Sequence, residues 1–202
     1  MTVRRSLLIL VALLVIPSAD LPAASRHKAP GSDLETRVET TLAGHLDGDR
    51  IADWRATLPA GSLEREAADW ILAWLPLSDL ADLDLPLLRE HVEVAAESYR
   101  EAPWREELPR EIWLHFVAPH RVSQEPAQPW RRAFRDELWP RVKDAADMEL
   151  AALAVNRWCR EQATFKPTNG RDQGPLTTQA RGIGRCEEEM ILAICALRAA
   201  GI

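Results

Sequence analysis

The stretch Gly182–Ile202, GIGRCEEEMILAICALRAAGI, joins a glycine-rich turn to a cysteine and then to an apolar segment. Apolar residues recur there at the spacing of one helical face, so residues 186–200 are predicted to form a helix. The face expected to be buried consists of Met190, Ile191, Ile194 and Leu197. Gly201 stands where a helix C-cap is expected, and Cys186 is expected to open the helix.

A thiol at the start of a helix has chemical consequences. Free backbone N–H groups and the positive end of the helix dipole favour the thiolate, and the same N–H groups can stabilise an oxyanion during acyl transfer. The three glutamates that follow Cys186 disfavour the thiolate, so a partner base is needed. The alternative is a small buried cysteine at the start of a core helix, and the Gly-x-Cys pattern alone favours that alternative.

The residues around Cys186 resemble the nucleophile helix of the transglutaminase-like superfamily. The matching positions in this helix are Gly184-Arg185-Cys186-Glu187-Glu188, Leu192, Ala196-Leu197-Arg198-Ala199 and Gly201-Ile202. Further similar segments are Asp69–Ala96, Val117–Val122, Glu125-Pro126, Phe165–Thr168, Arg171–Gln173 and Pro175–Thr178. The resemblance extends over roughly residues 34–202 and favours Cys186 as a nucleophile.

This resemblance implies a papain-like α+β core, in which a His activates the cysteine and an Asp orients that His. Both are expected on strands that follow the cysteine helix. All histidines of this chain precede Cys186, namely His27, His45, His91, His115 and His120. The chain is therefore expected to be mainly α, a fragment or early-terminated form that lacks the β half beyond Ile202. A rearranged site with His115 or His120 as base is the less favoured alternative.

Other residues near the cysteine are weaker candidates. Gln173 is a candidate oxyanion donor and Gly184 a candidate part of the substrate loop, although a glutamine there more often ties a loop by backbone hydrogen bonds. Arg171 and Asp172 are expected to be structural and to contact other groups. There is no C-x-x-C or paired-His spacing, so a zinc site has little support, and thiol chemistry needs neither a metal nor an organic cofactor.

The N-terminus has the layout of a secretory signal peptide. Arg4 and Arg5 precede the ten-residue apolar run Leu7–Ile16, which is too short to span a bilayer, and Pro17 ends it. Residues 1–25 are therefore predicted to be a signal peptide, with a retained anchor as the alternative. We expect a secreted or periplasmic protein with no stable membrane insertion after signal cleavage.

The rest of the chain is divided by composition. A linker is expected at 26–32, a helical and Pro/Trp-rich region at 33–144, and an incomplete transglutaminase-like core at 145–202. Apolar spacing predicts helices from Asp33 through Leu46, over 63–74 and around 88–99, and again over 131–139 and 145–160. Residues 103–130 are expected to be rich in loops, with a short helix or strand at 111–117, and residues 165–184 to form an extended loop.

Charge and cysteine content narrow the possible functions. The net charge of −6 argues against a nucleic-acid partner, which requires a basic face. An odd number of cysteines in an exported protein leaves at least one free or paired between chains, and a Cys159–Cys195 disulfide is one possibility. Of the tryptophans, Trp54, Trp70 and Trp74 are expected in the core, and packing is favoured over groove lining for Trp104, Trp130 and Trp139.

These observations favour an exported transglutaminase-like thiol enzyme domain. Cys186 would attack the amide carbonyl of a peptide or protein and transfer the acyl group to water or an amine through a thioester. As this chain the domain is expected to be inactive, because the His and Asp are missing. The alternatives are a non-catalytic exported helical binding or scaffolding protein and a Trp-rich glycan-binding module.

Overall fold

The computed structural model describes residues 30–202, with side chains from Asp33 onward, so the expected signal peptide at 1–25 lies outside the described residues. The first helices are α1 (Pro30–Gly44), α2 (Gly48–Thr57), α3 (Leu63–Ala73), α4 (Asp79–Asp82) and α5 (Leu85–Glu101). The middle segment holds η1 (Arg105–Glu107), α6 (Arg110–Ile112) and the π-helix η2 (Trp113–Val117). The last elements are α7 (Trp130–Val142), α8 (Met148–Gln162), β1 (Thr164–Phe165), α9 (Pro175–Arg181), β2 (Ile183–Gly184) and α10 (Cys186–Ala200). The expectation of a mainly α chain is confirmed.

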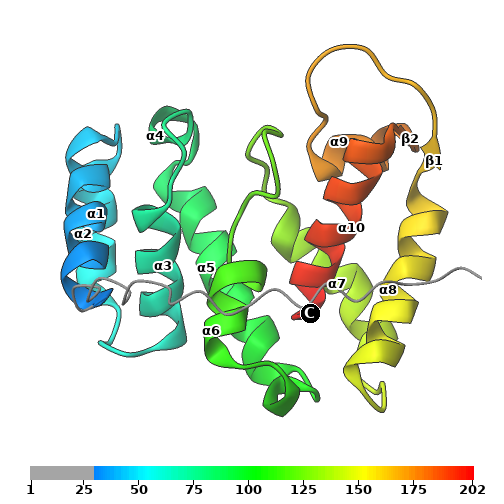
Figure 1. Ribbon diagram of the computed structural model, residues 1–202, viewed down its shortest axis with the longest axis horizontal. Coiled ribbons are helices and arrows are strands. Elements are labelled where there is room, and N and C mark those ends of the chain that lie inside the picture. The colour runs from blue at the N-terminus through cyan, green and yellow to red at the C-terminus, as the bar shows by residue number, and fades with distance from the viewer. Residues whose placement is uncertain (1–29) are drawn as a thin grey trace, which may run out of the picture.

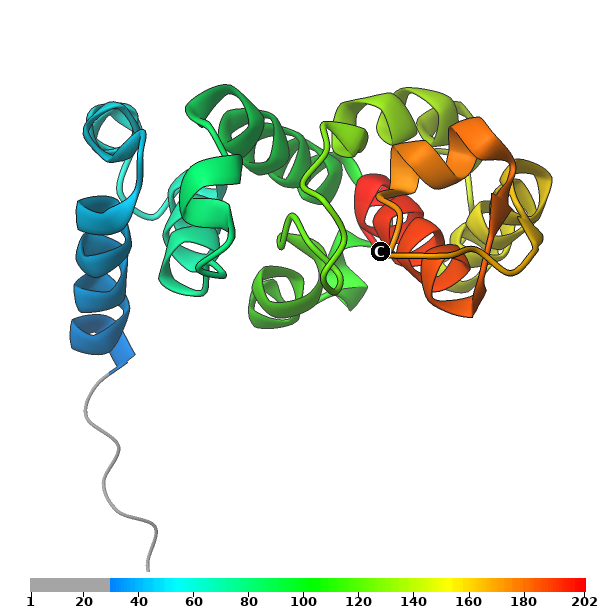
Figure 2. The same ribbon diagram turned by 90° about the horizontal axis from the view of Figure 1, so that it is seen from above.

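The helices follow one another across the molecule from α1 to α8, and α10 returns between α5, α7 and α8 (Figure 1, Figure 2). Polar N-caps begin three of them: Ser62 accepts a hydrogen bond from Arg65 N in α3, Asp84 from Leu87 N in α5, and Asp147 from Leu150 N in α8. Among the helices of residues 30–202, none combines the length and apolarity needed to cross a bilayer.

The buried apolar residues form two clusters. The first joins α1, α2, α3 and α5 to the middle segment, and it contains the predicted face of α5, namely Leu88, Val92, Ala95 and Tyr99. The second joins α7, α8 and α10 around Trp130, Phe134 and Trp158. Residues on both sides of the boundary expected between 144 and 145 share this second cluster.

The buried face of α10 differs from the prediction. Ile191 is buried, but Met190 is 45% exposed and Ile194 and Leu197 are half-buried. The remaining buried apolar positions are Leu192, Cys195, Ala196, Ala199 and Ala200. Because α10 contacts α5, α7, α8 and α9, its buried surface is wider than one stripe and is rotated away from Met190. Gly201 confirms the expected C-cap, with a φ of +82°.

The segment 165–184 is not the expected extended loop. It contains helix α9, which begins at Pro175 and ends at Arg181, and the C-cap Gly182 has the left-handed conformation with a φ of +64°. The two-residue strands β1 and β2 pair in parallel, with Thr164 opposite Ile183 and Phe165 opposite Gly184. This pairing fixes the chain immediately before Cys186.

Three smaller expectations near the N-terminus and the middle segment are corrected. Helix α1 begins at Pro30, inside the expected linker 26–32, and ends at Gly44, so Leu46 lies outside it and is exposed. Residues 110–117 are helical, which excludes the strand. Trp74 is exposed rather than in the core, with the Arg37 guanidinium 4.1 Å above its ring.

The tryptophans of the Pro-rich segment are packed. Trp104 and Trp130 are buried, and their indole N–H groups donate to Gly201 O and His120 O. Trp139 is half-buried beneath the Arg135 guanidinium. The packing interpretation is therefore confirmed for Trp104 and Trp130.

Candidate functional site

Cys186 is the first residue of α10, and it is exposed. The preceding residue, Arg185, has the extended backbone of an N-cap, so the N–H groups of the first turn are free of helical partners. Gly184 is buried, and a Cβ there would lie 3.1 Å from Glu188 Cβ and 3.2 Å from Thr178 Cγ2. Glycine at 184 thus lets the chain approach α9 and α10 closely before it turns at Cys186.

Glu188 organises the chain around the cysteine. Its side chain is fully buried, and its carboxylate accepts hydrogen bonds from Arg185 N at 2.9 Å, Gln173 N at 3.2 Å and Thr168 Oγ1 at 2.8 Å. Burial alone would raise the pKa of this carboxyl, but the hydrogen bonds from Arg185, Thr168 and Gln173 outweigh burial and lower it. Glu188 therefore stays ionised and ties the loop before α9 to the start of α10.

Gln173 lies in this loop and is buried. Its side-chain Nε2 donates to Ile183 O at 3.4 Å, and its Oε1 accepts from Arg181 Nη1 at 2.5 Å. These contacts fit the loop-tying interpretation of the residue. Its amide is engaged with Ile183, and its role as an oxyanion donor stays a prediction.

The expected structural role of Asp172 is matched by an ion pair with Arg185. Arg185 also lies 3.2 Å from Glu187. Arg171, in contrast, has no hydrogen bond or ion pair with any residue of 33–202. The loop is thus held to the start of α10 through Asp172, while Arg171 is exposed.

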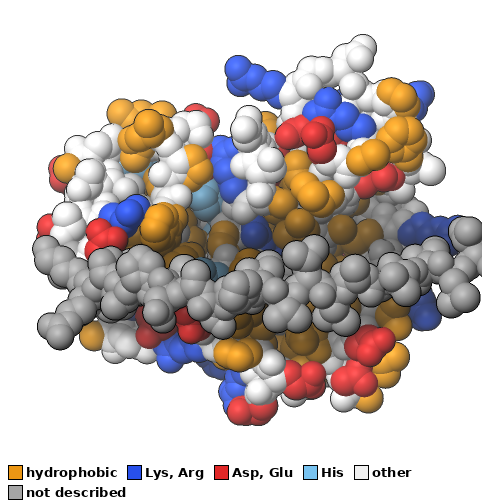
Figure 3. Space-filling model, viewed as in Figure 1, with side chains coloured by type: hydrophobic (Ala, Val, Ile, Leu, Met, Phe, Trp, Pro, Cys, Tyr) orange, Lys and Arg blue, Asp and Glu red, His pale blue; other side chains and the backbone are white. Residues whose placement is uncertain are grey.

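A cleft of about 590 Å³ opens beside Cys186. Its walls come from the segment before α4, the loop after η2, the loop before α9 and the first residues of α10. They are Pro76, Ser78, Arg121, Ser123, Gln124, Gly170, Arg171, Asp172, Arg185 and Glu187. Figure 3 shows a hollow with blue side chains between the N-terminal helices and the loop above α10. The two neighbours of Cys186 in sequence thus line a polar cleft of a size that admits a short peptide.

The other two thiols have different surroundings. Cys195 is fully buried and Cys159 is half-buried, and all three cysteines are free, so the possible Cys159–Cys195 disulfide is not formed. Burial raises the pKa of Cys159 to about 12 and also raises the pKa of Cys195. Of the three thiols, Cys186 is therefore the accessible one.

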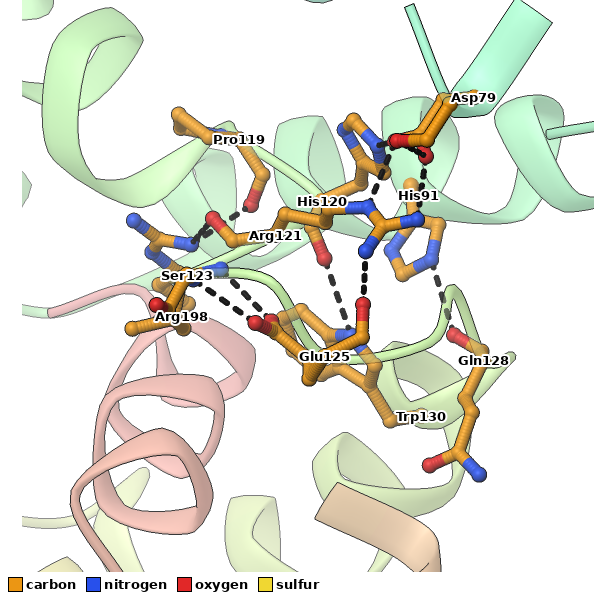
Figure 4. A network of polar contacts seen from close by, with 12 residues as sticks. Asp79, His91, Pro119, His120, Arg121, Ser123, Glu125, Gln128, Trp130 and Arg198 are labelled. Atoms are coloured by element: carbon orange, nitrogen blue, oxygen red, sulfur yellow. Dashed lines mark hydrogen bonds and ion pairs between the residues drawn. The ribbon is translucent and has the colours of Figure 1, made fainter. Parts of the chain in front are cut away.

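A buried polar network lies where α4, α5, α10 and the loop after η2 meet, around His120, the less favoured candidate base, and its Arg121 also lines the cleft beside Cys186 (Figure 4). Asp79 of α4 is fully buried; it accepts a hydrogen bond from His120 Nε2 at 2.7 Å and one from Arg121 Nε at 2.6 Å. Burial would raise the pKa of Asp79, but these two hydrogen bonds outweigh burial and lower it. Burial lowers the pKa of His120, and the neighbouring carboxylate does not compensate fully.

A second histidine adjoins this pair. His91 of α5 is fully buried, its ring centroid is 5.9 Å from that of His120, and its Nε2 donates to Gln128 O at 3.0 Å. Burial and the nearby Arg131 charge hold its pKa well below the usual value. Both histidines are therefore neutral at pH 7 and take up a proton only at acidic pH.

Buried charged side chains hold the loop 117–128 in place by hydrogen bonds to its backbone. Arg131 is fully buried and donates to the carbonyls of Val117, Ala118 and Pro119 at 2.8–3.1 Å, while Arg198 of α10 donates to Phe116 O at 2.7 Å. The Glu125 carboxylate accepts from the backbone N–H groups of residues 122 and 123, each at 2.7 Å. The loop thus has buried partners from α7 and α10.

The ring of His120 is hydrogen-bonded to Asp79 and, among the described residues, makes no hydrogen bond to Cys186. Arg198, which contacts the carbonyls of Pro119 and Arg121, lies twelve residues after Cys186, or about 18 Å along the axis of α10. His115, the other alternative base, is exposed and lies against Trp70, with ring centroids 4.1 Å apart and ring planes tilted by 45°. Within residues 33–202, no histidine is hydrogen-bonded to Cys186.

Sequence reasoning did not predict that Glu188 is the buried acceptor that ties the loop to α10, and it missed Asp79. A glutamate at the third position of a helix is a known capping signal, so Glu188 had a local sign. Asp79 and His120 are 41 residues apart, and no local pattern pairs them. In the described part of the chain, no three His, Cys, Asp or Glu side chains gather into a metal-binding group. Comparisons with models of protein families, with curated proteins and with solved structures gave no match.

Proposed function

We propose that this chain carries the nucleophile of an exported thiol enzyme that acts on amide carbonyls, as its resemblance to the transglutaminase-like superfamily implies. The observation that carries the proposal is the position of Cys186. It is exposed at the first turn of a 15-residue helix, next to a polar cleft, whereas Cys195 is buried, Cys159 is half-buried, and burial raises the pKa of both these thiols. The two flanking residues, Arg185 and Glu187, line that cleft.

The chemistry follows from this geometry. The Cys186 sulfur, once deprotonated, attacks the carbonyl carbon of a peptide or protein amide. The C–N bond breaks, the amine leaves with a proton from a general acid, and a thioester remains. Water or a second amine then attacks the thioester and releases the thiol. Free N–H groups at the start of α10 are suitably placed to stabilise the oxyanion of both steps.

Turnover also requires a base for the thiol proton. No described histidine contacts Cys186, so for residues 1–202 alone we propose a reactive nucleophile without efficient turnover. No metal or organic cofactor takes part in this scheme. The signal-peptide pattern at 1–25 supports a secreted or periplasmic location, where such an enzyme would meet peptide substrates.

Alkylation of the native chain tests the nucleophile. With iodoacetamide at pH 7 and readout by peptide mass spectrometry, we expect Cys186 to be modified at least tenfold faster than Cys159 and Cys195. We also expect it to react faster than the same cysteine in a synthetic peptide of residues 182–190, because the peptide lacks the helix N-terminus. A Cys186 rate equal to or below that of the peptide would contradict the proposal.

The second candidate is a non-catalytic exported binding or scaffolding protein. It is favoured by the same lack of a histidine at Cys186 and by the cleft, which can hold a peptide without chemistry. A glutamine-containing peptide and a fluorescent amine separate the two candidates. Amine incorporation or ammonia release that is lost in Cys186→Ala supports the enzyme. Peptide binding that is unchanged in Cys186→Ala, with no product, supports the binding protein.

A further inference from the structure

Helices α8 and α10 lie on the side of the molecule away from α1 (Figure 1), and an apolar groove runs between them. Two adjoining cavities of about 320 and 450 Å³ make up the groove and share Asn156, Cys159 and Ala193. The start of α8 faces the end of α10 in the first cavity, and the end of α8 faces the start of α10 in the second. The groove therefore follows two antiparallel helices over most of their length.

Large apolar side chains on and beside the groove are exposed to solvent. The exposed fractions are 51% for Leu150, 44% for Leu153, 58% for Phe165 and 45% for Met190. Figure 3 shows orange side chains gathered over the β1 and α10 region. Of these side chains, Leu153 and Phe165 line the groove, and exposed apolar side chains in a groove are typical of an interaction site because their contact with water costs free energy.

The charges of α8 indicate which partner fits. Glu149 and Arg160 lie eleven residues apart, which puts them on the same face of α8, about 16 Å apart along its axis. Both line the groove, at opposite ends, and neither has an ion pair within the described part of the chain. Arg157, which is exposed, adds a second positive charge near the Arg160 end, and Glu189 of α10 lies across the groove from Arg160.

We propose that this groove is the contact surface between two copies of the chain. In a two-fold symmetric pair the same surface of both copies meets, so α8 lies antiparallel to α8 of the second copy. Glu149 of each copy then faces Arg160 of the other, and Leu153 of each packs near the centre into the opposite groove. The pairing covers the exposed apolar side chains and gives both unpaired charges a partner, which a neutral apolar partner would not do. The proposal is independent of the function of Cys186.

Charge reversal tests the pairing. In sedimentation velocity, we expect the wild-type chain to dimerise, and Glu149→Arg or Arg160→Glu to raise the dissociation constant about tenfold by placing like charges opposite each other. The double variant Glu149→Arg/Arg160→Glu restores the wild-type constant. An equimolar mixture of the two single variants also dimerises, because each copy then offers the charge that the other lacks.

Controls separate this pairing from loss of fold and from unspecific adhesion. Glu39→Arg reverses an exposed charge on α1 that has no ion pair within residues 33–202, and it should leave the dissociation constant unchanged. Leu153→Glu should abolish the dimer while circular dichroism and the unfolding midpoint stay as in the wild type. A monomeric wild-type chain at 0.1 mM (roughly the weak end of specific association) would overturn the proposal. A dimer that is insensitive to both single reversals, or not restored in the double variant, would overturn it as well.

Discussion

At the scale of single residues, the position of the nucleophile candidate depends on a neighbour that does no chemistry. The Cys186 side chain has no hydrogen bond within residues 33–202, whereas Glu188, two positions later, accepts hydrogen bonds from three donors in two segments. These contacts fix the turn at Arg185 and the loop that includes Gln173. The cysteine is thus exposed yet positioned, because the residues on both sides of it are held.

Replacing Glu188 should therefore destabilise the chain around Cys186. Glu188→Ala removes a buried acceptor and leaves the N–H groups of Arg185 and Gln173 without partners, which should lower the free energy of unfolding by about 3 kcal/mol. Urea unfolding followed by circular dichroism measures the change. Glu187→Ala, in which a mostly exposed carboxylate is removed from the same turn, should change it by less than about 0.5 kcal/mol. Equal effects of the two substitutions would refute the role given to Glu188.

At the scale of elements, local signals predicted the helices that have clear caps and one apolar face. Helix α5 has both, with Asp84 as N-cap and Leu88, Val92 and Ala95 buried. Helix α9 was missed because it has seven residues, too few for a periodic pattern, and is marked by Pro175 and Gly182 alone. The buried face of α10 was misjudged because several helices surround it, so that periodicity does not single out one stripe.

The loop 117–128 shows why the polar network escaped prediction. Its partners come from α4, α5, α7 and α10, and each contact joins residues far apart in sequence, such as Arg198 and Phe116. No spacing rule connects such residues. The position of Cys186 at a helix start, in contrast, was predictable because the signal is contained in neighbouring residues.

Of the side chains that hold the loop 117–128, the buried Arg131 should be the one whose replacement destabilises the fold most. Its planar fork reaches carbonyls of the loop and also Arg198 O at 3.2 Å, and lysine has fewer donors on a single nitrogen. We expect Arg131→Lys to lower the free energy of unfolding by about 2 kcal/mol, because buried carbonyls lose their donors. The adjacent Arg132, exposed and paired with Glu97, provides the control: Arg132→Lys should cost less than about 0.5 kcal/mol. A similar loss of unfolding free energy in both variants, measured by urea unfolding, would show that Arg131 has no special role in holding the loop.

At the scale of the whole molecule, the two hydrophobic clusters meet at a polar junction. Asp79 and His91 come from helices on the side of the first cluster, and Trp130 and Arg198 from helices of the second. His120 contacts members of both sides, through its ring and its carbonyl. The packing of one half of the molecule on the other thus depends on buried groups that can take up protons.

Acid should therefore weaken the fold as a whole. The pKa values of His91 and His120 are below their usual value of 6.5 in the folded chain, so between pH 6.5 and those lower values the unfolded chain binds more protons. The neutral histidines contribute fully to the free energy of unfolding above pH 6.5. As the pH falls below 6.5, this contribution is lost by up to about 1.4 kcal/mol per pH unit for each histidine. The lowered pKa values of Asp79 and Glu188 add a further loss, which begins below about pH 4.5 and deepens as the pH falls through those values.

Urea unfolding at pH 7.5, 6.5, 5.5 and 4.5 measures this dependence, and histidine variants assign it. His91→Leu removes one buried titrating group together with its hydrogen bond to Gln128 O, so it should lower the stability at pH 7.5 but flatten the decline between pH 6.5 and 5.5. His115→Leu changes an exposed histidine and should leave the slope as in the wild type. If the free energy of unfolding of His91→Leu falls with pH as steeply as that of the wild type, the decline cannot come from the His91 ring. Such a result would place the acid sensitivity elsewhere in the molecule.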